Sequence, residues 1–302
     1  MDGILIIDKP AGITSHDVVA RVRRSLRTKR AGHTGTLDPF ATGVMVVVVG
    51  KATRLAQFLD KDEKEYVAEV QFGWETDTGD VTGVRSAECG LGNEEVAARV
   101  GEIEWEELLA KFRGTIKQVP PMYSAKKLEG KKLYELARKG VEVEREAVEV
   151  TIRELEILER SVVSDQRSAL EVRVVCSAGT YIRTLAEDIG RATGLLAHLT
   201  ALRRTRAGKF GIEQAVTLEA LAESESPHEL LLPVEQAVSH LPVFELHEDR
   251  VAKTRSGMST RDLTGRFADG ETAAMFSPKG ELVAVGRFIE TEKAIQPKVV
   301  LG

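Results

Sequence analysis

Residues 32–50 constrain the fold more than any other part of the chain, because a glycine-rich segment runs there directly into an uninterrupted apolar run. The run, Val44-Met-Val-Val-Val-Val49, is short, β-branched and bounded by glycines, which predicts a buried strand. The segment before it contains a single acid, Asp38. Because Pro39 pushes the backbone of the preceding residue toward extended conformations, Asp38 is predicted to stand in a stiff loop against a rigid core strand. Such a loop can hold one nucleophilic carboxylate in place.

Three other kinds of site do not fit the spacing of the residues. Gly50-Lys51 is followed by Ala52 rather than Ser or Thr, so the sequence lacks a phosphate-binding P-loop here. His16 and His33 have no Cys or Glu at ligand spacing, and we expect no metal site. Cys176 has no nearby His and lies at an inward position of a predicted strand, which argues against a nucleophilic thiol.

The segment Gly32-His-Thr-Gly-Thr-Leu-Asp-Pro-Phe-Ala-Thr-Gly43 resembles the catalytic motif of the TruB family of tRNA pseudouridine synthases. Further motifs similar to those of the family follow in the expected order between about residues 3 and 210. They are Gly3–Ser15 with Lys9-Pro10, Glu65–Gly73, Thr76–Asp80, Pro120–Lys126, Gly130–Tyr134, Cys176–Arg183 and Leu202–Arg204. The departures are small: Met45 replaces a commoner leucine, and Glu75 stands where some members have a basic residue.

The resemblance implies a role for each matching residue of the active site. Asp38 is the expected catalytic carboxylate. Arg183 is its expected cationic partner, because a buried carboxylate without a nearby cation tends to stay protonated. A bidentate pair between the two would also fix the orientation of Asp38. Tyr66 is expected to lie against the uracil ring and to relay the proton from C5. Leu202 is expected to form the apolar wall of the pocket. The target base must be extruded from a stacked RNA loop, and His33 is suited to support the vacated stack.

The formal net charge of −5 does not favour an RNA partner, but phosphate contacts depend on where the charges lie. Basic residues are concentrated in 21–30, 126–139 and 203–209, whereas acids collect in 94–107 and 142–159. Together with the resemblance, these clusters indicate that the chain binds the T-arm stem-loop of tRNA. The expected RNA-binding side chains are Lys9, Lys126, Lys131, Lys132 and Arg203.

Strand and helix patterns mix along the chain without a βαβ rhythm, which favours an α+β class. We expect helices from an N-cap at Ser15, over 52–59 and over 105–112 with a cap at Gly114. Residues 66–72 and 170–176 alternate like strands, and the second leads into a helix carrying Ile182. The resemblance implies the pseudouridine synthase fold, with a mostly antiparallel sheet, over residues 1–235 and an RNA-gripping insertion at about 120–147.

Residues 240–302 have a different sequence pattern, which is typical of a small β-domain. Ser277-Pro-Lys-Gly280 is a turn signal that joins two apolar segments into a predicted hairpin. This part resembles the PUA module, an RNA-binding domain that follows the catalytic domain in the family.

We expect a cytoplasmic, monomeric protein. No apolar run approaches transmembrane length, the N-terminus lacks the features of a secretory signal, and Cys89 and Cys176 cannot form a disulfide framework.

The predicted function is the isomerisation of uridine to pseudouridine at position 55 in the T loop of tRNA, with no cofactor and no metal. Two alternatives are a non-catalytic tRNA-folding chaperone and a guide-dependent rRNA pseudouridine synthase; the length of the segment from Pro120 to Arg145 favours the stand-alone enzyme over the latter. The sequence leaves open whether the carboxylate acts on the sugar or on the base.

Overall fold

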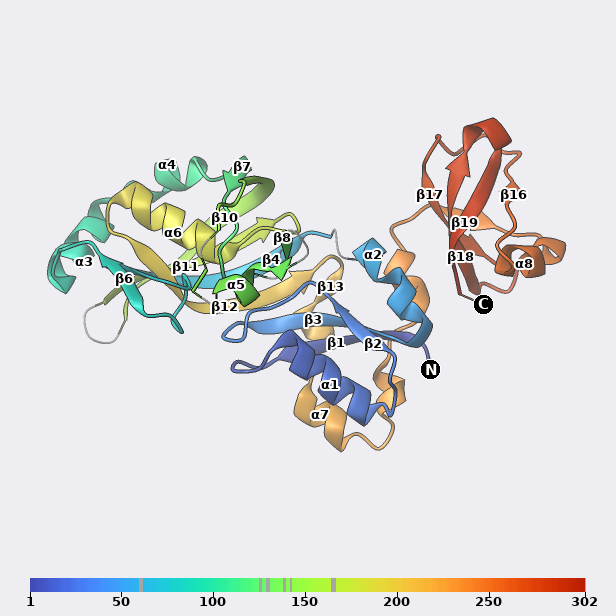
Figure 1. The fold of residues 1–302 in the computed structure, drawn as a ribbon, viewed down its shortest axis with the longest axis horizontal. Coiled ribbons are helices and arrows are strands. Elements are labelled where there is room, and N and C mark those ends of the chain that lie inside the picture. Colours follow the sequence, from blue (N-terminus) through green and yellow to red (C-terminus); the bar gives the residue numbers. More distant parts are fainter. Residues whose placement is uncertain are drawn as a thin grey trace.

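A ten-stranded, mostly antiparallel sheet forms the framework of the larger domain (Figure 1). The computed structural model describes residues 1–59, 62–124, 127–128, 131–137, 140–141, 143–163 and 167–301. The main path of the sheet runs β14 (Val216–Thr217), β1 (Gly3–Lys9), β3 (Thr42–Val49), β12 (Ala197–Ala207), β4 (Lys64–Phe72), β11 (Arg167–Cys176), β10 (Val148–Val163) and β7 (Gly114–Gln118). The short strands β2 (Ala31–Thr34) and β13 (Phe210–Gly211) pair with β3 and β12.

Strand β3 lies between β1 and β12, and the predicted buried strand is confirmed. Met45, Val47 and Val49 face one hydrophobic cluster, whereas Val44, Val46 and Val48 face another. Both faces of the strand are therefore covered by protein, which explains why its sequence is apolar throughout instead of alternating.

Helices cover the sheet in two groups (Figure 1). The pair α1 (Ser15–Ser25) and α7 (Leu218–Glu223) covers the face of β1 and β3 that carries Met45. The helices α3 (Asn93–Glu102), α4 (Trp105–Ala110) and α6 (Ile182–Thr193) pack on the part of the sheet formed by β4, β11 and β12. This second group surrounds the larger apolar core, which includes Phe72 and Trp105.

Three local predictions differ from the structure. The N-cap of α1 is Thr14, which forms a capping box with Asp17, and Ser15 is the first helical residue. Residues 50–59 form a 3₁₀ turn, η1 (Gly50–Leu55), before α2 (Ala56–Leu59), instead of one helix. Helix α4 already ends at Ala110, and Gly114 begins β7 with a φ of +85°.

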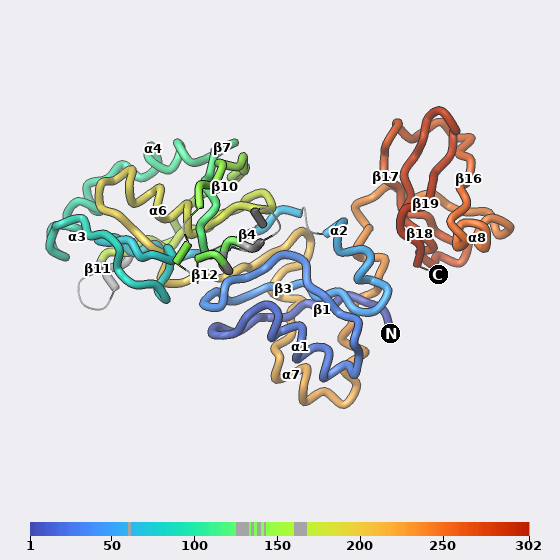
Figure 2. The backbone as a smooth tube through the Cα atoms, in the orientation of Figure 1, coloured from blue at the N-terminus to red at the C-terminus, as the bar shows by residue number. Residues whose placement is uncertain are grey.

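The C-terminal residues form a separate five-stranded β-domain beyond α2 (Figure 2). Its strands are ordered β15 (Val243–Glu245), β17 (Thr272–Phe276), β18 (Leu282–Ile289), β19 (Ala294–Val300) and β16 (Thr260–Arg261), with α8 (Glu248–Arg255) packed beside them. The predicted hairpin is confirmed: β17 and β18 are joined by a turn in which the Gly280 N–H donates to Ser277 O at 2.9 Å.

The remaining elements are short. They are β5 (Trp74–Thr76), β6 (Arg85–Glu88), β8 (Lys127–Leu128), β9 (Lys131–Lys132), α5 (Leu133–Ala137), η2 (Ile212–Gln214), η3 (Pro227–Leu230), η4 (Val234–Val238) and η5 (Glu290–Glu292). Within the described ranges no helix combines the length and the apolar character that a membrane crossing needs. The expected α+β class, with a mostly antiparallel sheet and a small β-domain at the end, is confirmed.

Candidate active site

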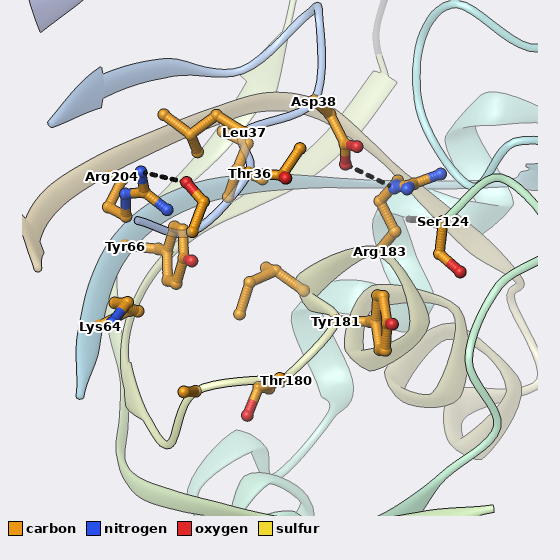
Figure 3. A pocket seen from close by; sticks show the side chains of 15 residues that line it. Thr36, Leu37, Asp38, Lys64, Tyr66, Ser124, Thr180, Tyr181, Arg183 and Arg204 are labelled. Atoms are coloured by element: carbon orange, nitrogen blue, oxygen red, sulfur yellow. Dashed lines mark hydrogen bonds and ion pairs between the residues drawn. The ribbon is translucent and has the colours of Figure 1, made fainter. Parts of the chain in front are cut away.

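A cavity of about 420 Å³ opens where the Asp38 loop, β4, β12 and the start of α6 meet (Figure 3). It brings together four of the residues predicted from the sequence. The lining residues are Gly35, Thr36, Leu37, Asp38, Lys64, Tyr66, Ser124, Ala178, Gly179, Thr180, Tyr181, Ile182, Arg183, Leu202 and Arg204. Asp38, Tyr66, Arg183 and Leu202 thus share one concave site although they lie far apart in the sequence.

Asp38 and Arg183 form an ion pair at this cavity. Arg183 Nε lies 2.9 Å from Asp38 Oδ2; the arginine side chain is 5% exposed and the carboxylate 32%. The two terminal nitrogens of Arg183 donate to the backbone carbonyls of Thr78 and Tyr123, each at 2.7 Å. The expected bidentate pair is therefore not formed. Instead, the guanidinium holds three separate chain segments together.

The electrostatic environment of Asp38 is balanced between opposing effects. Burial raises the pKa of its carboxyl group, the positive charge of Arg183 opposes that rise, and the negative charge of Asp80 adds to it. The Asp80 carboxylate also lies 3.7 Å from Arg183 Nη1. Arg183 therefore favours the ionised form of Asp38, although burial keeps the pKa of the carboxyl group above its usual value.

The chain between β11 and α6 delivers Arg183 to the cavity. Gly179 adopts a φ of +86°, which glycine tolerates best, and α6 begins two residues after Thr180. The backbone of Tyr181 is braced by the fully buried Gln118 side chain, which accepts from Tyr181 N at 3.0 Å and donates to Tyr181 O at 3.2 Å. Tyr181 itself lines the cavity. Tyr181 belongs to the Cys176–Arg183 motif but was not among the site residues predicted from the sequence.

Two buried side chains fix the backbone on either side of Asp38. The Ser15 hydroxyl accepts from Leu37 N at 2.9 Å and donates to Leu37 O at 3.0 Å. Lys9 Nζ donates to the carbonyls of Pro39 at 3.1 Å and Ala41 at 2.6 Å. Lys9 is fully buried and supports the loop in this structure, and the RNA contact expected of it stays a prediction. Burial lowers the pKa of Lys9 to about 8.

The other predicted side chains occupy different surroundings. Tyr66 and Leu202, each 7% exposed, form walls of the cavity. His33 does not line the cavity; it lies in β2, edge-to-face with His16 at a ring distance of 5.8 Å. Arg203 pairs with Asp8 at 2.8 Å and is 41% exposed.

The predicted RNA-gripping lysines fall in the insertion. Lys131 and Lys132 form β9, which pairs with β8, and Lys126 lies outside the described residues. Within the described chain, no group of three or more His, Cys, Asp or Glu side chains is arranged to hold a metal ion.

Comparison with known proteins gives a consistent result. Residues 23–182 match the model of the TruB family pseudouridylate synthase N-terminal domain, and residues 183–239 match the tRNA pseudouridylate synthase B C-terminal domain. The chain is 39% identical to tRNA pseudouridine synthase B of Bacillus pumilus, over 94% of this chain and 92% of the relative. It is 47% identical to the protein of the same name from Bordetella pertussis, over 80% of this chain and 94% of the relative.

Solved structures resemble the whole chain. A structure titled as a Cbf5-Nop10-Gar1 complex matches with a TM-score of 0.72 and 29% identity, covering 99% of this chain and 85% of the other. One titled as an H/ACA RNP bound to a substrate RNA containing 2'-deoxyuridine matches with a TM-score of 0.71 and 27% identity, with the same coverage. The expected fold is confirmed by these matches, and the chain belongs to the TruB family of pseudouridylate synthases.

Proposed function

We propose that the protein isomerises uridine to pseudouridine in the T loop of tRNA, at position 55, with Asp38 as the catalytic carboxylate. Family membership and relatives named tRNA pseudouridine synthase B support the reaction and the substrate class. The observation that carries the assignment is a single carboxylate at a walled cavity, paired with the almost fully buried guanidinium of Arg183.

The cavity suits an extruded nucleotide. At about 420 Å³ it lies within the range of small-ligand pockets, and the side chains of Tyr66, Tyr181 and Leu202 give it flat and apolar walls. Extruding the base costs a few kcal/mol, which stacking against such walls offsets. His33 and the partly exposed Arg203 are the candidates for contacts with the surrounding RNA.

The isomerisation needs little besides positioning and proton transfer. The bond between N1 and the ribose breaks, a bond from C5 to the ribose forms, C5 loses a proton and N1 gains one, so no atom is lost and no redox partner is required. Asp38 must be ionised whether it attacks the sugar or the base, and Arg183 favours that form. Tyr66 is placed on the cavity wall to relay the C5 proton.

We also infer how the parts of the protein divide the work. Residues 1–235 carry out the reaction, the segment 120–147 grips the T-arm through Lys126, Lys131 and Lys132, and the PUA-like domain at 240–302 contacts the rest of the tRNA. The protein acts as a monomer in the cytoplasm. The presence of the whole 120–147 segment favours this stand-alone mode over a guide-dependent one.

Mass-spectrometric mapping of tRNA incubated with the purified protein tests the function. The wild type should form pseudouridine at position 55 in the presence of EDTA. Asp38→Asn should lose turnover while its tRNA affinity stays within a few fold, because phosphate contacts and RNA shape hold the substrate. Near wild-type modification by Asp38→Asn would refute the assignment. If the wild type binds and refolds tRNA without modifying it, the protein is a chaperone instead.

A further inference from the structure

Arg204 is a buried residue at the cavity, and it has no role in the reaction as proposed above. It lies on β12, opposite Gly43 of β3 on one side and Tyr66 of β4 on the other. Its side chain is only 1% exposed, yet it lines the cavity. Because directly opposed residues of neighbouring strands project from the same face of a sheet, Arg204 and Tyr66 lie next to each other (Figure 3).

The guanidinium of Arg204 binds both ends of the loop that carries Asp38. Its Nη2 donates to Gly35 O at 3.2 Å, and its Nε donates to Val44 O at 2.7 Å. Tyr66 is its directly opposed neighbour on β4. One rigid group therefore connects the start and the end of the loop and lies beside the tyrosine.

Arg204 differs from the neighbouring arginines of β12 in how its positive charge is compensated. Arg203 and Arg206 on the same strand pair with the carboxylates of Asp8 and Glu65. Among the described residues, no carboxylate forms an ion pair with Arg204, and its guanidinium donates hydrogen bonds to the backbone carbonyls of Val44 and Gly35. A buried cation without a counter-ion is unfavourable for folding, so a merely structural role would be served better by a neutral side chain.

The positive field of Arg204 acts on the titratable groups of the site. It contributes to the lowered pKa of Lys9. Burial raises the pKa of Tyr66, and the charge of Arg204 opposes that rise more than any other group, whereas Cys176 and Asp38 add to it. The ionised form of Tyr66 is thus the form that Arg204 favours.

We propose that Arg204 is a positioning residue for the isomerisation, acting through Tyr66 and the Asp38 loop. It fixes the tyrosine oxygen relative to Asp38 and stabilises negative charge on that oxygen, once the phenol proton has passed to solvent. The C5–H bond then breaks toward this oxygen, which takes the proton, while the electron pair stays in the ring and restores its double bond. This inference rests on the proposed function and on Tyr66 as the proton acceptor.

Kinetics of two substitutions test the proposal. Arg204→Met keeps most of the volume and removes the charge, and should lower kcat about 100-fold, as loss of one preorganised donor does in other enzymes. Arg204→Lys keeps the charge but lacks the planar fork that reaches both ends of the loop, and should lower kcat about 10-fold. KM for a T-arm stem-loop should stay within about threefold of wild type in both, because phosphate contacts supply most of the affinity.

Arg173→Met is the matched control. Arg173 lies on β11 in the same sheet and is paired with Glu65, Glu154 and Glu156, away from the cavity. Its loss should leave kcat unchanged. A folded Arg204→Met variant with wild-type kcat would overturn the proposal, and so would an effect confined to KM. If Arg204→Met does not fold, Arg204→Lys decides by the same criteria.

A spectroscopic measurement separates positioning of Tyr66 from general support of the fold. The four tyrosines can be replaced biosynthetically by difluorotyrosine, whose phenol titrates nearer neutral pH, and the Tyr66 signal in the ¹⁹F spectrum assigned with Tyr66→Phe. Arg204→Met should shift the titration of Tyr66 upward, whereas Arg173→Met should not. An unshifted titration would overturn the proposal even if kcat fell. If the wild-type protein makes no pseudouridine, the proposed function is refuted. The titration would still test whether Arg204 acts on Tyr66.

Discussion

Asp38 meets two opposing demands at the scale of a single residue. The carboxylate must be charged to react, but burial makes the charged form unfavourable and raises its pKa in the folded protein. An acid whose pKa is higher in the folded state binds its proton more tightly there than in the unfolded chain. Above the unfolded pKa of about 3.9, ionised Asp38 therefore lowers the stability of the protein, and protonation relieves this effect as the pH falls.

Asp38→Asn should accordingly be at least as stable as wild type at pH 7, and any gain should shrink as the pH falls toward 4. Urea unfolding at several pH values, with Asp249→Asn as a control for an exposed aspartate, measures this difference. A lower stability of Asp38→Asn at neutral pH would mean that the pair with Arg183 outweighs the burial of the charge.

Neighbouring substitutions at the start of α1 can separate loop geometry from helix stability. Ser15→Ala leaves the N–H and C=O of Leu37 without their partner and should cost about 1–3 kcal/mol. It should also lower kcat about 10-fold or more, because Leu37 directly precedes Asp38, the proposed catalytic carboxylate. Thr14→Ala removes the N-cap of the same helix, should cost about 1 kcal/mol, and should leave kcat unchanged. Equal kcat values for the two variants would show that Ser15 does not position the loop.

At the scale of elements, the sequence predicted those strands and turns that depend on residues close together in the chain. The apolar run of β3, the alternation in β4 and the hairpin turn at 277–280 each depend on residues a few positions apart, and each is confirmed. The proposed catalytic residues, which were predicted from motif resemblance, line one cavity.

What the sequence did not disclose are contacts between distant segments. The bonds from Ser15 to Leu37 span 22 residues, and those from Arg183 to Thr78 and Tyr123 span 105 and 60. No periodicity or spacing encodes such pairings. The support that Lys9 gives to the Asp38 loop was missed for the same reason, because only the folded chain shows that its ammonium binds the carbonyls of Pro39 and Ala41.

The insertion offers a test of RNA gripping by one small element, β9. Lys131→Glu with Lys132→Glu should weaken T-arm binding and reduce the slope of log affinity against log salt by roughly one unit for each lost phosphate contact. The same number of charge reversals outside the insertion, Arg99→Glu on α3 with Lys111→Glu directly after α4, should leave the slope near wild type. Identical slopes in wild type and the Lys131/Lys132 variant would show that other residues bind the RNA backbone.

At the scale of the whole molecule, the C-terminal domain is more than a tethered accessory. Ala274, Leu282, Val285, Val299 and Leu301 belong to the same hydrophobic cluster as residues of β1, β3 and α2. Arg54 Nη1 also donates to Val300 O at 2.6 Å. Deleting this domain would therefore expose apolar surface of the larger domain as well as remove an RNA-binding surface.

Surface reversals test its RNA role without that complication. Arg261 and Lys298 are exposed on β16 and β19, so changing both to Glu should leave the fold intact. Affinity for full-length tRNA should fall by about tenfold or more, while affinity for the isolated T-arm stem-loop stays within about twofold. Equal weakening of both RNAs would show a general electrostatic effect, and no weakening of either would remove this face from the interface.

The three-way contact of Arg183 also bears on how the protein comes to be active as it folds. Its guanidinium joins residues 38, 78 and 123, which belong to segments made early, in the middle and later in the chain, while Arg183 follows them all. Closing such loops is slow compared with forming local helices and hairpins. During refolding, pseudouridine-forming activity should therefore return later than the helical circular-dichroism signal. During synthesis, the ion pair between Asp38 and Arg183 could therefore form only after β11 had joined the sheet and α6 had packed on it.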